Sequence, residues 1–91
     1  MDEGTYVAEC FWPGFSERDL SALDERTQAH VAELSQGGQN VRYLGSLLLR
    51  ADEVVLCRFR GDADAVQVAA TSAAIPFERI LETAESPWPL Q

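Results

Sequence analysis

The spacing of hydrophobic and polar residues changes several times along the chain, and each change marks a structural element. Residues 5–12 (TYVAECFW) are β-branched, aromatic and partly alternating, which predicts a strand that Pro13 and Gly14 end. Residues 16–34 then show helical spacing, with Ser16 as the N-cap and acidic residues in the first turn. One face of this helix carries an apolar stripe formed by Leu20, Leu23, Thr27, Val31 and Leu34.

The second half of the chain predicts two strands, a helix and a last strand. Residues 41–49 and 54–60 are rich in β-forming residues, and the polar turn 50–53 between them indicates a hairpin. Asp62 is the expected N-cap of a second helix, which Ile75 and Pro76 end. Residues 77–83 form a short fourth strand, and residues 84–91 form a Pro-rich tail with Trp88. We therefore expect a single domain over residues 1–83, followed by this tail. The second helix has a small apolar face formed by Val66, Ala69, Ala70 and Ala73.

The element order βαββαβ is that of the split βαβ motif. It predicts an α+β fold in which right-handed crossovers place both helices on one face of a four-stranded antiparallel sheet. The other face of the sheet is then open, yet the strands are apolar on both sides, as Val7, Phe11, Val54 and Leu56 illustrate. A soluble monomer rarely leaves such a face in water. We expect a second copy of the chain, a ligand, or both to cover it.

Charged residues within the strands indicate which side chains lie on the open face. An unpaired carboxylate is costly in a core, so Glu9 should lie there, and the same reasoning places Arg58 and Arg60 beside it. A four-residue turn at 50–53 would pair Leu47 with Leu56, Gly45 with Arg58 and Tyr43 with Arg60. It therefore adds Tyr43, Gly45 and Leu47 to this face, because directly opposite residues share a face. A three-residue turn would instead add Leu44, Ser46 and Leu48.

With the four-residue turn, we predict that Glu9 and Arg58 approach each other on adjacent strands and that Tyr43 lines the same apolar cavity. Apolar walls with a few convergent polar groups are typical of a small-molecule site. The alternative is a purely structural ion pair between Glu9 and Arg58. The candidate ligand-binding residues are Glu9, Tyr43, Arg58 and Arg60.

Composition limits the possible partners. The chain has 91 residues, no lysine and a net charge of −8, which argues against nucleic acid and against anionic membrane surfaces. No apolar run is long enough to span a membrane. Two cysteines are too few for a disulfide scaffold, so a reduced, cytoplasmic location is expected.

Several short motifs resemble those of the DUF4242 family over residues 5–83. They are Phe11-Trp12-Pro13 at a strand end, Ser46 with Cys57-Arg58-Phe59 in the hairpin, and Ile75-Pro76 followed by Arg79-Ile80. The resemblance implies a ferredoxin-like fold that dimerises through the sheet, and characterised relatives are described as nickel-binding. Many members have a histidine directly before the serine, where this chain has Gly45.

Metal chemistry has little support in the residues themselves. His30 is the one histidine and is only a weak candidate ligand, while Cys10 and Cys57 lie on predicted neighbouring strands and are expected to pack as small buried residues. No Cys-x-x-Cys or His-x-x-x-His spacing occurs. We therefore expect no tight nickel or zinc site and no cofactor.

Three classes of function remain open. The first is a small dimeric ligand-binding or accessory protein. The second is a cofactor-free monooxygenase, cyclase or isomerase acting on a small aromatic or polyketide-like substrate. In that enzyme Arg58 would stabilise an enolate or phenolate, with Glu9 or Tyr43 moving protons. The third is a nickel-binding protein, as the family resemblance implies.

Overall fold

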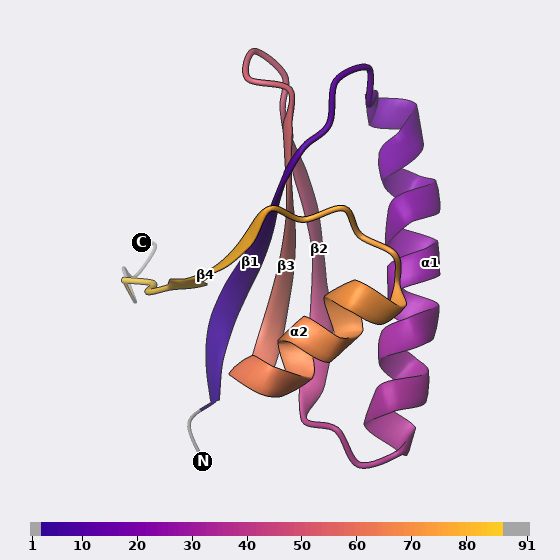
Figure 1. The fold of residues 1–91 in the computed structure, drawn as a ribbon, viewed down its shortest axis with the longest axis vertical. Helices are drawn as coiled ribbons and strands as arrows, with labels where there is room; N and C mark the ends of the chain where they lie inside the picture. Colours follow the sequence, from indigo (N-terminus) through magenta and orange to yellow (C-terminus); the bar gives the residue numbers. More distant parts are fainter. Residues whose placement is uncertain (1–2, 87–91) are drawn as a thin grey trace, which may run out of the picture.

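The computed structural model describes residues 3–86 and confirms the βαββαβ order (Figure 1). The first strand starts two residues earlier than expected and the last one starts two later, while Trp88 of the predicted tail lies outside the described residues. The elements are β1 (Glu3–Phe11), α1 (Glu17–Gln36), β2 (Val41–Leu49), β3 (Val54–Asp62), α2 (Ala63–Ser72) and β4 (Arg79–Thr83).

The four strands form one antiparallel sheet in the order β2-β3-β1-β4. The β2–β3 turn has the four residues expected, because Leu49 is opposite Val54 and Leu47 is opposite Leu56. Two backbone bonds close the turn, from Asp52 N–H to the Leu49 carbonyl at 3.2 Å and from Glu53 N–H to the Arg50 carbonyl at 3.3 Å. Gly45 is therefore opposite Arg58, as predicted.

Beyond Gly45 the register of β2 shifts by one residue. Tyr43 is opposite Phe59, although the next pair along the strand is Gly45 with Arg58, so Leu44 has no partner and forms a β-bulge. Gly45 has φ = +105°, a backbone conformation that favours glycine. The bulge moves Tyr43 to the other face of the sheet, so the prediction that Tyr43 pairs with Arg60 on the open face is wrong.

Both helices pack on the same face of the sheet. In Figure 1, α1 runs along β2 and α2 crosses in front of β3. A capping box begins α1, because Ser16 N–H donates to Asp19 Oδ2 at 2.8 Å and the Asp19 N–H faces the Ser16 side chain. The two helices are linked where Arg26 Nε donates to the Ala73 carbonyl at 3.0 Å.

The core lies between this helix layer and the sheet. Phe59 is its largest fully buried side chain, and Leu23 and Val31 of the predicted α1 stripe pack into it with Thr27. The small face of α2 is buried as expected and brings that helix close to the strands: Val66, Ala69, Ala70 and Ala73. No helix in the described part of the chain is long and apolar enough to cross a membrane.

Candidate functional site

The sheet face opposite the helices has two ends of different chemistry. Cross-strand pairing defines its rows, because directly opposite residues of an antiparallel sheet point to the same side. We call the end near the β2–β3 turn the apolar end; it comprises Phe11, Leu47, Leu49, Val54 and Leu56. We call the opposite end the arginine end; it comprises Arg42, Arg58 and Arg60.

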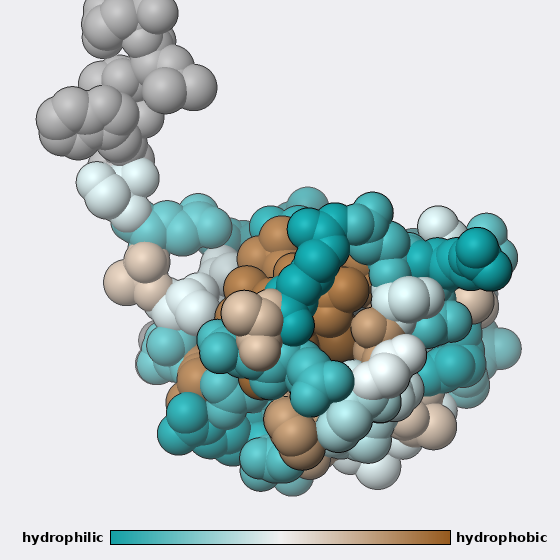
Figure 2. All heavy atoms as spheres, turned by 90° about the horizontal axis from the view of Figure 1, so that it is seen from above, coloured by the Kyte–Doolittle hydropathy of each residue, from teal (hydrophilic) through white to brown (hydrophobic). Residues whose placement is uncertain are grey.

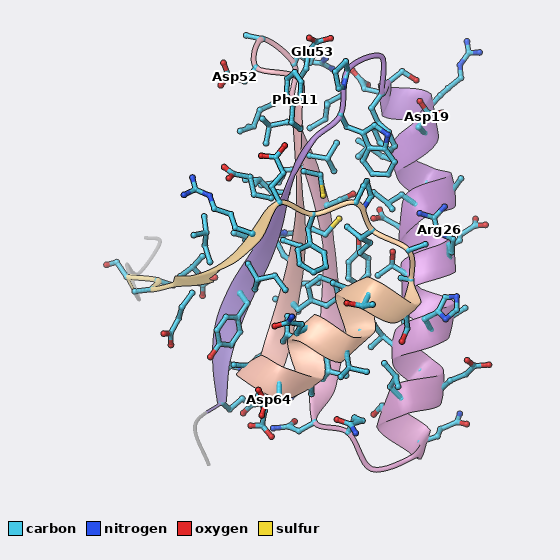
Figure 3. The ribbon with its side chains drawn as sticks, in the orientation of Figure 1. Phe11, Asp19, Arg26, Asp52, Glu53 and Asp64 are labelled. Carbon is cyan, nitrogen blue, oxygen red and sulfur yellow. The ribbon has the colours of Figure 1, made fainter. Side chains whose placement is uncertain are left out.

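The apolar end leaves large side chains in water. Phe11 is 54% exposed, Leu47 46% and Leu49 41%, although all three lie in regular strands. Phe11 lies at the same end of the molecule as Asp52 and Glu53 of the turn (Figure 3), consistent with the 2.7 Å bond from Trp12 N–H to the Glu53 carbonyl. Seen from this end, hydrophobic surface gathers between polar segments (Figure 2). Such a patch is typical of an interaction site.

Glu9 lies on the open face as predicted, but its partner is not Arg58. In the register, Glu9 is opposite Leu56 on one side and Arg79 on the other, and Arg79 Nε donates to Glu9 Oε1 at 2.5 Å. Glu9 and Arg58 do lie on adjacent strands of the open face, in neighbouring rows, but no ion pair joins them within residues 3–86, so the predicted pairing of their charges is wrong. The sequence contained the correct signal, because alternation along β4 puts Arg79 on the side opposite Ile80, which packs against the core.

Arg58 lies beside the bulge and donates from Nη2 to the carbonyl of Leu44 at 2.8 Å. The space for its guanidinium exists because residue 45 is glycine; a Cβ there would lie 3.3 Å from Arg58 Nη2. The Nε of Arg58 is buried and has no hydrogen-bond partner within the described residues. A buried donor without a partner is destabilising, so this arginine has unused hydrogen-bonding capacity.

Arg60 and Arg42 are directly opposite each other on β3 and β2. Arg60 donates from Nη1 to Thr5 Oγ1 at 3.2 Å. Its Nε also lies 3.9 Å from a carboxylate oxygen of Glu3, and this ion pair is long and exposed to water. No ion pair involving Arg42 or Arg58 occurs within residues 3–86. Sequence reasoning missed Arg42 because it assumed a regular strand. A glycine inside a strand pattern often marks a bulge, and Gly45 was that signal.

The displaced Tyr43 takes part in a polar cluster on the covered face. Its hydroxyl donates to Asp24 Oδ1 at 2.6 Å, and Ser46 Oγ donates to the same oxygen at 2.7 Å. Burial, followed by the bond to Asp24, raises the pKa of Tyr43 well above its ordinary value. Asp24 was missed although it lies beside the apolar stripe of α1, where a carboxylate needs partners. Tyr43 is therefore separated by the sheet from Glu9 and Arg58, so the three do not form the acid–base set predicted for an enzyme.

The two cysteines lie next to this cluster and are both free and fully buried. Their mutual hydrogen bond and their burial raise the pKa of Cys57 far above its usual range, so its thiol stays protonated at neutral pH. Such a thiol is a poor nucleophile and a poor metal ligand.

The donor set for a metal is also sparse. His30 is half-buried on α1, and within residues 3–86 no three His, Cys, Asp or Glu side chains are grouped to hold a metal ion.

The surface hollows described on the molecule border the helix layer. One, about 560 Å³, lies between the start of α1 and the hairpin and is lined by Phe15, Glu17, Leu48 and Arg50, among others. Another, about 380 Å³, lies between α1 and β2 and reaches Tyr43 and Arg42 at the edge of the sheet. Neither includes Glu9, Arg58 or Arg60.

The strand order, the antiparallel pairing and the single helix layer define the ferredoxin-like α+β fold. The fold is similar to that in the crystal structure of SCO4226 from Streptomyces coelicolor A3(2), with a TM-score of 0.69 and 20% sequence identity. The match covers 93% of this chain and 99% of SCO4226. No family model matches the chain, and no curated protein matches it by sequence.

Proposed function

We propose that the chain is a small homodimeric ligand-binding or accessory protein that acts through the open face of its sheet. The apolar end packs against the same end of a second copy. The rest of the open face, which carries the polar side chains, then lies at the edge of the interface and serves as the ligand-binding surface.

The observation that carries the proposal is the exposure of Phe11, Leu47 and Leu49 on one sheet face. Apolar surface yields about 25 cal/mol per Å² when it is removed from water, so covering three large side chains stabilises an association by several kcal/mol before its entropic cost. A second copy is the partner we choose for electrostatic reasons. Within residues 3–86, the open face carries four of the seven arginines and three of the fourteen acidic residues, whereas the rest of this part of the chain is strongly negative. Two acidic copies therefore repel each other least when they approach through this face.

Sedimentation equilibrium tests the homodimer with a matched pair of variants. Leu47 and Val68 are similarly exposed, at 46% and 43%, but Val68 lies on α2 and not on the open face. We expect wild type and Val68→Asp to sediment as dimers at micromolar concentration and Leu47→Asp to sediment as a folded monomer.

The opposite results would remove the proposal. A wild-type chain that is monomeric at about 100 μM lacks the interface, because stable homodimers associate well below that concentration. Equal behaviour of the two Asp variants would show that the open face is not where the copies meet. Circular dichroism of each variant distinguishes a lost interface from a lost fold.

A further inference from the structure

The arginine end carries three positive charges, of which Arg60 alone has an ion-pair partner within the described residues. Arg42 and Arg60 are directly opposite each other, and like charges in that position destabilise a sheet. Arg58 lies on the same face one row away, with a buried Nε that has no partner in the described structure. Among the described residues, the acid that pairs with this cluster is Glu3, which lies 3.9 Å from Arg60 and is itself exposed.

These three arginines belong to a protein with a net charge of −8. Of the other two acids on the described open face, Glu9 is paired with Arg79, and Asp62 forms no ion pair with an arginine within residues 3–86. Such a cluster has no stability benefit in the free chain, since the repulsion between its charges opposes folding. The cluster gains a benefit when an anion joins it.

We propose that the arginine end binds the carboxylate of a small apolar acid. Arginine guanidinium groups hold carboxylates through paired N–H···O bonds, and the missing side chain at Gly45 makes room for the Arg58 guanidinium on this face. Val7 and Leu81 share the row of Arg58 and are half-buried, so they offer an apolar floor for the hydrocarbon part of the ligand. A singly charged acid fits better than a phosphate, because the rest of the protein repels a more highly charged anion.

This inference deepens the proposed function and rests on its assignment of the open face as the working surface. It uses a different end of the face from the dimer contact, so the two can fail separately. The test is a titration of ¹⁵N-labelled protein with 2-naphthoate and with its uncharged analogue 2-naphthamide, followed by amide chemical shifts.

We expect the acid to bind roughly tenfold more tightly than the amide, a difference of about 1.4 kcal/mol. The shifts should be largest around residues 42, 58 and 60. The double variant Arg42→Gln/Arg60→Gln, which removes the charge of two exposed side chains, should bind the acid and the amide equally well. The preference for the acid should stay unchanged in Arg18→Gln, because Arg18 is an exposed arginine of α1. Arg58→Gln should also lose the preference, with its fold checked by circular dichroism because Arg58 contacts the bulge.

Equal binding of acid and amide, or no binding of either, would overturn the inference even if wild type sediments as a dimer. Tighter binding of 1-naphthyl phosphate than of 2-naphthoate would overturn the carboxylate assignment. A preference for the acid that survives in monomeric Leu47→Asp would support the arginine end although the dimer is lost, and a dimer without that preference would leave only the proposed assembly.

Discussion

The two faces of the sheet use the same strands but treat polar side chains differently. On the covered face, Tyr43 and Ser46 both donate to one oxygen of Asp24, although the buried hydroxyl of Thr27 has no hydrogen-bond partner in the described structure. On the open face, Arg58 keeps a buried donor without a partner and Arg42 has no ion pair in the described structure. The Asp24 cluster is thus satisfied within the single chain, whereas the open face has apolar surface and arginine charge that a partner would satisfy.

The largest expected difference between the faces concerns two phenylalanines. Phe59 is fully buried on the covered face, so Phe59→Ala should lower the free energy of unfolding by about 3–5 kcal/mol. Phe11 is 54% exposed on the open face, so Phe11→Ala should cost the monomer less than about 1 kcal/mol. Urea denaturation at low protein concentration measures both. Equal losses would mean that the open face is part of the core.

The next effect concerns the polar cluster of the covered face. Asp24→Ala leaves the hydroxyls of Tyr43 and Ser46 without their acceptor, and we expect a loss of about 2–4 kcal/mol, since bonds to a charged group are the stronger ones. Glu25→Ala, at an exposed position of the same helix, is the matched control and should change stability by less than about 0.5 kcal/mol. Similar effects of the two substitutions would show that the cluster contributes nothing specific.

The sequence predicts the architecture well because periodicity reports burial directly. The apolar stripe of α1, the small face of α2 and the four-residue turn all follow from spacing and turn chemistry, and the structure confirms them. The observed strand ends differ from the predicted ones by up to two residues, because fraying and loop contacts determine where a strand ends.

The site is predicted less well because one extra residue in a strand changes the face on which all residues beyond it lie. A single extra residue, Leu44, sends Tyr43 to the covered face and Arg42 to the open one. The partner of Glu9 depends on which of two neighbouring strands offers the nearer cation, and β4 supplies Arg79 directly opposite it. The spacing of residues along a single strand does not determine which side chains meet across three neighbouring strands.

The stability of the covered face should depend on alkaline pH through the hydroxyl of Tyr43. The pKa of Tyr43 is raised in the folded state, by burial first and then by its bond to Asp24, so the folded state favours the neutral phenol. This contribution to stability is fully present below about pH 10, where an unfolded tyrosine ionises, and is lost as pH rises above it. We expect wild type to lose about 1.4 kcal/mol more per pH unit than Tyr43→Phe between pH 10 and 11.5 in urea titrations. Parallel pH profiles would show that the hydroxyl of Tyr43 is not held protonated by the fold.

The smallest effect is expected for the ion pair of the open face. Glu9 and Arg79 have side chains that are 28% and 63% exposed, so water screens their attraction in the single chain. A double-mutant cycle of Glu9→Gln and Arg79→Gln should give a coupling energy of about 0.2–1 kcal/mol, and 1 M salt should reduce it further. A coupling above about 2 kcal/mol in the monomer would mean that this face already behaves as a protein interior.

The same cycle becomes a probe of assembly when it is repeated at a concentration where wild type is dimeric. Leu47, Leu56, Glu9 and Arg79 form one row across the sheet, so a second copy that covers Leu47 also removes water from the ion pair. Removing water strengthens the attraction between the charges, and the measured coupling should rise with dimerisation. A coupling that is independent of protein concentration would indicate that the copies meet elsewhere, because an ion pair in that row would otherwise respond to the partner.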